Sequence, residues 1–205
     1  MFGVLLALFA TTDEELVRRF KGGDREAFSE LVKRYQDRVF SLCLRWLGDR
    51  EAAEETTQDV FLALYRSLGE FRGESQLSTW IFRVATNHCK NRRMYRIRRA
   101  HDRHEPLEGP ETEDAAPRQI PDPGPGTDAH LHRSEAEEIL SRGLAQLDET
   151  HRSILVLRDV EDLSYEEIAD ILSLPRGTVK SRLHRARAEL ARILGRWLRP
   201  GDVLE

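Results

Sequence analysis

The basic and hydroxyl side chains between Arg176 and Arg199 have the types and spacing of a surface that binds DNA. This stretch holds eight Arg or Lys and one acid, Glu189, although the whole chain has a net charge of −4. Arginine and lysine bind phosphates and guanine edges, and small hydroxyl side chains contact either. If a helix begins near Pro175, one of its sides carries the side chains of Lys180, Ser181, His184 and Arg185. The alternative is an ordinary amphipathic helix with a solvated basic face.

Two short helices joined by a tight turn must position these side chains. Ser164 followed by Glu167 fits a capping box at the start of the first helix. Its apolar stripe is Ile168, Ala169, Ile171 and Leu172. Pro175 cannot continue that helix but suits the start of the next. The second helix would bury Val179, Leu183, Ala186, Leu190 and Ile193. This pattern is typical of a helix-turn-helix, which lays its second helix in the major groove of DNA.

Composition limits the remaining classes. A chain of 205 residues with 33% charged residues and a mean hydropathy of −0.56 is typical of a soluble, mostly helical protein of one or two small domains. Cys43 and Cys89 are too few for a disulfide framework, and their spacing fits no zinc site. Each lies in an apolar helical pattern, which predicts buried free thiols; a redox switch is the alternative.

The chain divides into four segments. Residues 1–10 are apolar but too short to span a bilayer and lack the basic region of a signal peptide, so they predict an N-terminal extension of a cytoplasmic protein. Residues 11–99 form a helical domain. Residues 100–133 form a flexible linker, because 105–128 hold six prolines, three glycines and seven acids. The helical period returns in a second domain at 134–199, where Ser134 and Glu137 fit another capping box. The predicted fold class is all-α.

In the first domain, the spacing predicts helices that start after Thr12 and Asp24 and a further helix from Arg50 to Ser67. The buried face of the 50–67 helix and its extension would be Ala53, Thr57, Val60, Leu64 and Leu68. Its outward face would be Glu51, Glu54, Glu55, Gln58 and Leu62. An acidic face with an apolar residue set into it could contact a protein partner, but helix geometry alone favours a solvated face.

The stretch from Phe71 to Arg99 combines groups that bind unpaired DNA. A loop of small and polar residues leads to a helix that Ser78 is predicted to cap. One side of that helix would carry Trp80, Val84, Asn87 and Asn91, flanked by Arg83 and Lys90. Amides bond to base edges, arginines bind phosphate and aromatic rings stack on unpaired bases. The alternative is a core tryptophan followed by a solvated basic helix end.

Taken together, the motifs of the two predicted domains resemble those of the extracytoplasmic-function (ECF) sigma factors, the small two-domain class of bacterial sigma factors. DREAFSELVKRYQDRVF, from Asp24, resembles the start of sigma region 2, and AEETTQDVF, from Ala53, its core-binding helix. FRGESQLSTWIFRVATNHCKN, from Phe71, resembles the promoter-melting segment. LSYEEIADILSLPRGTVKSRLHRAR, from Leu163, resembles the promoter-reading helix-turn-helix of region 4. The motifs follow the family's order over residues 12–198.

The resemblance implies a transcription initiation factor that binds core RNA polymerase and directs it to promoters. It implies no catalytic residue, metal, cofactor or small-molecule substrate. Contact with the coiled coil of the largest polymerase subunit would come from Glu54, Glu55, Gln58, Asp59, Phe61 and Leu62. The melted −10 element would be held by Phe71, Ser75, Gln76, Asn87, Lys90 and Asn91. The −35 duplex would be read by Arg176, Thr178, Lys180, Ser181, His184 and Arg185. Further implied partners are the polymerase flap and an anti-sigma factor.

Three positions depart from the family pattern. Glu55 stands where aspartate is usual. Ser173 occupies a turn position where glycine is common, which predicts a strained turn. His184 stands at a position where promoter-reading residues vary, so it leaves the preferred −35 sequence open.

Two other classes compete with this interpretation. A helix-turn-helix regulator that acts without being a polymerase subunit would bind duplex DNA alone, but it has no use for the surface of tryptophan, asparagine and arginine in the first domain. A recombinase or nuclease would need a nucleophile beside arginines or converging carboxylates. The acids Glu51, Glu54, Glu55 and Asp59 form an outward helix face instead, so we expect no enzyme activity.

Overall fold

The computed structural model describes residues 11–102 and 139–197, and all regular elements within these two ranges are helices. The first range holds α2 (Asp13–Lys21), α3 (Glu26–Leu47), α4 (Arg50–Ser67), the 3₁₀ turn η1 (Leu68–Glu70) and α5 (Leu77–Asp102). The second holds a helical stretch at 139–146, α7 (Glu149–Leu155), η2 (Val156–Val160), α8 (Tyr165–Leu172) and α9 (Arg176–Leu194). The all-α prediction is confirmed. Within these ranges no helix is both long and apolar enough to cross a membrane.

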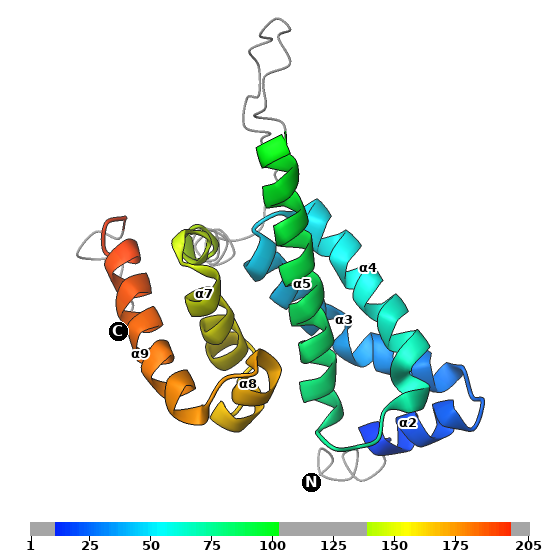
Figure 1. Cartoon of the computed structure of the whole chain (residues 1–205). Helices are drawn as coiled ribbons and strands as arrows, with labels where there is room; N and C mark the ends of the chain where they lie inside the picture. The colour runs from blue at the N-terminus through cyan, green and yellow to red at the C-terminus, as the bar shows by residue number, and fades with distance from the viewer. Residues whose placement is uncertain (1–10, 103–138, 198–205) are drawn as a thin grey trace, which may run out of the picture.

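The first bundle packs α3, α4 and α5 around one apolar core, with α2 lying across α3 (Figure 1). Trp46 and Phe82 are among its largest fully buried side chains. Local capping sets the helix ends: the Thr12 hydroxyl accepts from the Glu15 N–H, and the Asp49 carboxylate accepts from the Ala52 N–H. Between α3 and α4 the chain turns at Gly48, whose φ of 67° suits glycine.

Three details of this bundle differ from the sequence-based expectations. Ser78 does not cap α5, since the helix begins at Leu77 and the Trp80 N–H already bonds to the Gln76 carbonyl oxygen at 3.1 Å. Trp80 is half-buried, because its ring packs on Phe71 at the edge of the bundle. The helix also continues to Asp102, two residues past the predicted start of the linker at 100.

The second bundle packs α7 against α9, with α8 lying across them (Figure 1). Ser164 and Glu167 form the predicted capping box in both directions, with N···O distances of 2.8 and 3.2 Å. The predicted buried side chains of α9 are buried or half-buried. One turn of π-helix, η2, follows α7 and ends the helix ahead of the capping box. The N-terminal extension, residues 103–133 of the predicted linker and the Ser134–Glu137 capping box lie outside the described residues.

The two bundles pack directly on each other, through α3 with η2 and α5 with α8. The Arg38 guanidinium bonds to the Glu161 carboxylate at 3.0 Å, and this carboxylate is 3% exposed. Arg152 donates to carbonyl oxygens of its own bundle and also to the Trp46 carbonyl oxygen, at 2.7 Å. Burial lowers the pKa of the Arg152 guanidinium, because the charged form has lost water. Hydrogen bonds from Arg38 and Arg152 therefore link the two bundles.

Candidate functional site

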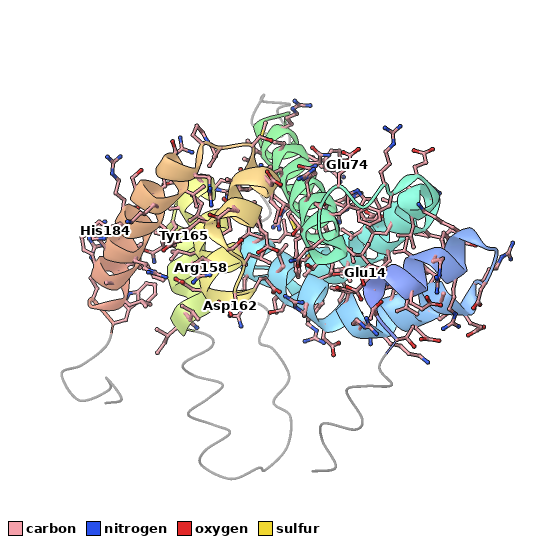
Figure 2. The ribbon with its side chains drawn as sticks, turned by 90° about the horizontal axis from the view of Figure 1, so that it is seen from below. Glu14, Glu74, Arg158, Asp162, Tyr165 and His184 are labelled. Carbon is pink, nitrogen blue, oxygen red and sulfur yellow. The ribbon has the colours of Figure 1, made fainter. Side chains whose placement is uncertain are left out.

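The turn before α9 orients that helix so that its outer face points away from both bundles. Ser173 has φ 54° and ψ 48°, in the left-handed region that the sequence predicted to be strained. Its neighbour Leu174 donates its N–H back to the Ala169 carbonyl oxygen at 2.9 Å, which closes the turn. His184 projects from the outer side of α9 (Figure 2), and the side chains of Lys180, Ser181 and Arg185 are exposed as well.

Ion pairing separates two kinds of cation on α9. Arg187 binds Asp159 through two hydrogen bonds, one of which joins Nε to Oδ2 at 3.1 Å. Arg176, at the start of the helix, pairs with Glu166 of α8. Within residues 11–102 and 139–197, neither Lys180 nor Arg185 has an acid partner. Lys180 and Arg185 belong to the set that the sequence predicts to read the −35 duplex, whereas Arg176 of the same set is the paired one. Thr178 lies half-buried beside them.

The loop between η1 and α5 forms one wall of a cavity of about 510 Å³. Phe71 and Trp80, with ring centroids 5.2 Å apart, line it together with Ser75 and Arg83. The Lys21 ammonium of α2 donates to the Phe71 carbonyl oxygen at 2.5 Å and so holds the loop in place. The cavity thus offers an aromatic surface beside a guanidinium, which suits a flat base with a phosphate.

The predicted side chains of α5 continue from this cavity along the helix. Asn87 and Asn91 are exposed and Lys90 is half-buried. Gln76, just before the helix, is exposed and lines a neighbouring cleft with α8. Thr79 at the start of α5 donates to Glu167 of the capping box at 2.9 Å, so this end of the helix touches the second bundle.

An apolar groove of about 550 Å³ lies between α3 and α4. Gln58, Phe61 and Leu62 of the predicted polymerase-binding set line it, and Leu62 is 55% exposed. Sequence reasoning missed the aromatic floor, where Phe28 and Tyr65 meet edge to face with centroids 5.0 Å apart. Phe28 is half-buried, and its ring is one wall of the groove.

The acids of the predicted polymerase-binding set differ in their partners. Glu54 pairs with Arg50 one turn earlier at 2.9 Å, and Glu55 pairs with Arg92 of α5. Asp59 is exposed and has no ion pair within the described parts of the chain. The six predicted residues therefore do not form one uniform surface: the groove and Asp59 are open, while both glutamates are tied to arginines.

Sequence reasoning also missed a histidine held between two acids in the second bundle. His151 Nδ1 lies 2.7 Å from Asp148 Oδ2 and 2.8 Å from Glu189 Oε2. These are hydrogen-bond distances, and Asp148 also caps α7 by accepting from the N–H groups of Thr150 and His151. The arrangement ties the start of α7 to α9 and so supports the helix that carries the exposed cations.

Comparisons with known proteins agree with this geometry. Residues 31–101 match the family described as Sigma-70 region 2, and residues 137–190 match Sigma-70, region 4. The chain is 38% identical over 189 residues to the RNA polymerase sigma-H factor of Pseudomonas aeruginosa, covering 91% of this chain and 96% of that protein. It is 37% identical over 178 residues to the ECF RNA polymerase sigma-E factor of Escherichia coli K12, covering 86% and 91%. The chain belongs to the family of ECF RNA polymerase sigma factors.

Solved structures show the same fold. One, described as CnrH in complex with the cytosolic domain of CnrY, superposes with a TM-score of 0.63 at 25% identity and covers 90% of this chain and 97% of the other. The sigma factor RpoE of Bartonella quintana, solved in complex with the anti-sigma factor NepR, has the same TM-score at 23% identity, over 82% and 96%.

As a sigma factor, the chain is an initiation subunit that binds core RNA polymerase and directs it to specific promoters. Family membership excludes the two competing classes. A stand-alone helix-turn-helix regulator has no region 2, and sigma factors are not enzymes.

Proposed function

We propose that residues 134–199 form the domain that reads the −35 duplex, with α9 in the major groove. Lys180, Ser181, His184 and Arg185 contact base edges, while Arg176 and Thr178, at the start of the helix, contact the phosphate backbone. The observation that carries this assignment is the pairing pattern: within the described residues Lys180 and Arg185 have no acid partner, while Arg187 on the flank is neutralised by Asp159. Unpaired cations bind DNA without first breaking an ion pair.

In the same proposal, residues 11–99 form the domain that binds the polymerase and the melted −10 strand, and 100–133 link the two. A base that leaves the stack enters the cavity beside Phe71 and Trp80, held by Ser75 and Gln76 at the loop. Three side chains then follow the strand along α5: Asn87, Lys90 and Asn91. Asn87→Ala should therefore slow promoter opening while the affinity for closed duplex stays the same.

The groove between α3 and α4 is the proposed contact for the coiled coil of the largest polymerase subunit. The exposed side chains of Leu62 and Tyr65 line it, and a helix of a partner packs well into an apolar groove. The predicted contacts are Gln58, Phe61 and Leu62 in the groove, Asp59 beside it, and Glu54 and Glu55 after their arginine pairs open. The polymerase flap is the proposed contact of the second domain.

One pair of variants tests the groove. Leu62→Asp places a charge in an exposed apolar contact and should weaken core binding by about 2 kcal/mol, roughly thirtyfold. Ile97→Asp is the control, because Ile97 is exposed to a similar degree, 53% against 55%, but lies on α5 away from the groove. Equal core affinity of both variants, measured by fluorescence titration with purified core polymerase, would reject the groove as the contact.

We also propose that this sigma factor works in the cytoplasm and is restrained by an anti-sigma factor. Support comes from the solved relative CnrH, which is bound to the cytosolic domain of CnrY. Co-purification of the tagged chain from its own host should recover such a partner, and addition of that partner should prevent core binding.

A further inference from the structure

Two thiols lie next to each other at the centre of the first bundle, and none of the proposed contacts uses them. Cys43 on α3 and Cys89 on α5 are 46 residues apart in the chain, both fully buried, with their sulfur atoms 3.6 Å apart. A disulfide bond is about 2.05 Å long, so a movement of about 1.5 Å between the sulfurs would join them. Side-chain rotation and a small shift of two helices can supply such a movement.

The two sulfurs are chemically unequal. The Cys89 thiol donates a hydrogen bond to Cys43 Sγ, which lowers the pKa of Cys43 although burial acts in the opposite direction. The same contact, together with burial, raises the pKa of Cys89. Cys43 is therefore the sulfur that ionises first, and the thiolate is the form that reacts with oxidants.

We propose that Cys43 and Cys89 form a reversible disulfide when the protein meets hydrogen peroxide, and that this link stops promoter opening. The Cys43 thiolate attacks one peroxide oxygen; the O–O bond breaks, leaving Cys43 as a sulfenic acid and releasing hydroxide, which takes up the proton that Cys43 lost. Cys89 sulfur then attacks Cys43 sulfur and the S–O bond breaks, with the Cys89 proton leaving in water. Two thiols lose two electrons, and one peroxide becomes two waters.

A small oxidant has a short route to Cys43. Thr57 interacts with the Cys43 sulfur and also lines the open groove between α3 and α4. Hydrogen peroxide is close to water in size, so fluctuation of these two helices is enough to admit it. Since the groove is the proposed polymerase contact, core polymerase bound there should slow the oxidation.

The Cys43–Cys89 disulfide would form beside the side chains that are proposed to hold the −10 strand. Its predicted effect on transcription therefore rests on the proposed function. Cys89 lies on α5 between Asn87 and the pair Lys90 and Asn91. Drawing the sulfurs together pulls this part of α5 toward α3 and moves the side chains that hold the −10 strand. Cys43 is also one turn before Trp46, whose carbonyl oxygen accepts from Arg152 of the second bundle.

Intact-protein mass spectrometry of the native full chain tests the modification without any variant. Peroxide should remove two hydrogen atoms per chain, dithiothreitol should restore them, and a peptide map should join Cys43 to Cys89. Cys43→Ala and Cys89→Ala should show no such loss. A disulfide that appears only in denaturant, or one that joins two chains, would overturn the proposal.

Promoter opening by the oxidised, the reduced and the re-reduced holoenzyme tests the consequence. Opening should fall severalfold on oxidation, recover with dithiothreitol, and stay unchanged in the peroxide-treated Cys89→Ala variant. If oxidised holoenzyme opened promoters normally, the proposal that the disulfide stops promoter opening would be wrong. If the reduced holoenzyme failed to open promoters, the proposed −10 role would fail, while the mass measurement would still decide the disulfide.

Discussion

Arg185 and Arg187 offer a matched pair of substitutions on α9 that separates base reading from simple charge. Both are exposed arginines two residues apart, and each change to alanine removes one positive charge. Arg185 has no acid partner within the described residues, so its guanidinium is available to DNA, whereas Arg187 is held by Asp159. We expect Arg185→Ala to lose a base-edge contact, worth about 1–3 kcal/mol or roughly 5- to 150-fold in affinity.

Arg187→Ala should cost far less, because it removes an exposed ion pair that is itself worth about 1 kcal/mol or less. We expect its promoter affinity to fall less than about fivefold. The assay is fluorescence anisotropy of holoenzyme on a selected promoter fragment at fixed salt, since affinity for DNA depends steeply on ionic strength. Equal losses for both variants, or a loss confined to Arg187→Ala, would refute the argument from ion pairing.

Three further substitutions test the framework that positions these surfaces. Ser173→Gly should stabilise the second bundle by about 0.5–1 kcal/mol in urea unfolding, because glycine relieves the left-handed φ of 54°; lower stability would contradict this. Arg152→Met should cost about 3 kcal/mol or more of unfolding free energy, because four carbonyl oxygens, three of them in buried hydrogen bonds, lose their donor; a near-neutral result would contradict it. Burial raises the pKa of Glu161 above its usual 4.5, so the packed bundles favour its protonated form. The stability that Glu161 contributes is fully present below pH 4.5 and is lost as pH rises through its raised pKa; Glu161→Gln should flatten this part of the pH profile, and an unchanged profile would contradict the assignment.

Local sequence signals predicted the helices of the second bundle well. The Ser164–Glu167 capping box works over three residues, and both of its hydrogen bonds are present. The strain at Ser173 was predicted because a turn between two close helices needs a left-handed residue, which serine adopts only at a cost. The error at Ser78 has the same origin: several polar residues precede α5, and hydrogen bonding to Gln76 starts the helix two residues earlier than the serine would.

Contacts between distant residues could not be predicted from spacing. Arg38 and Glu161 are 123 residues apart, and the sequence shows only that one is basic and the other acidic. The sequence predicted Cys43 and Cys89 as buried free thiols, but only the packing of α3 on α5 brings their sulfurs to 3.6 Å. The aromatic floor of the groove depends in the same way on the angle between α3 and α4, which decides whether Phe28 faces the core or the edge.

In vitro transcription with purified bacterial core polymerase and a randomised promoter library tests the central claim most directly. We expect initiation only when the chain and core polymerase are both present, from promoters that share one preferred sequence near −10 and another near −35. Arg185→Ala should change the selected −35 sequence and leave the −10 sequence intact. Initiation that selects no −35 sequence would contradict the proposed −35-reading domain. No initiation with core polymerase would contradict the role of the chain as an initiation subunit.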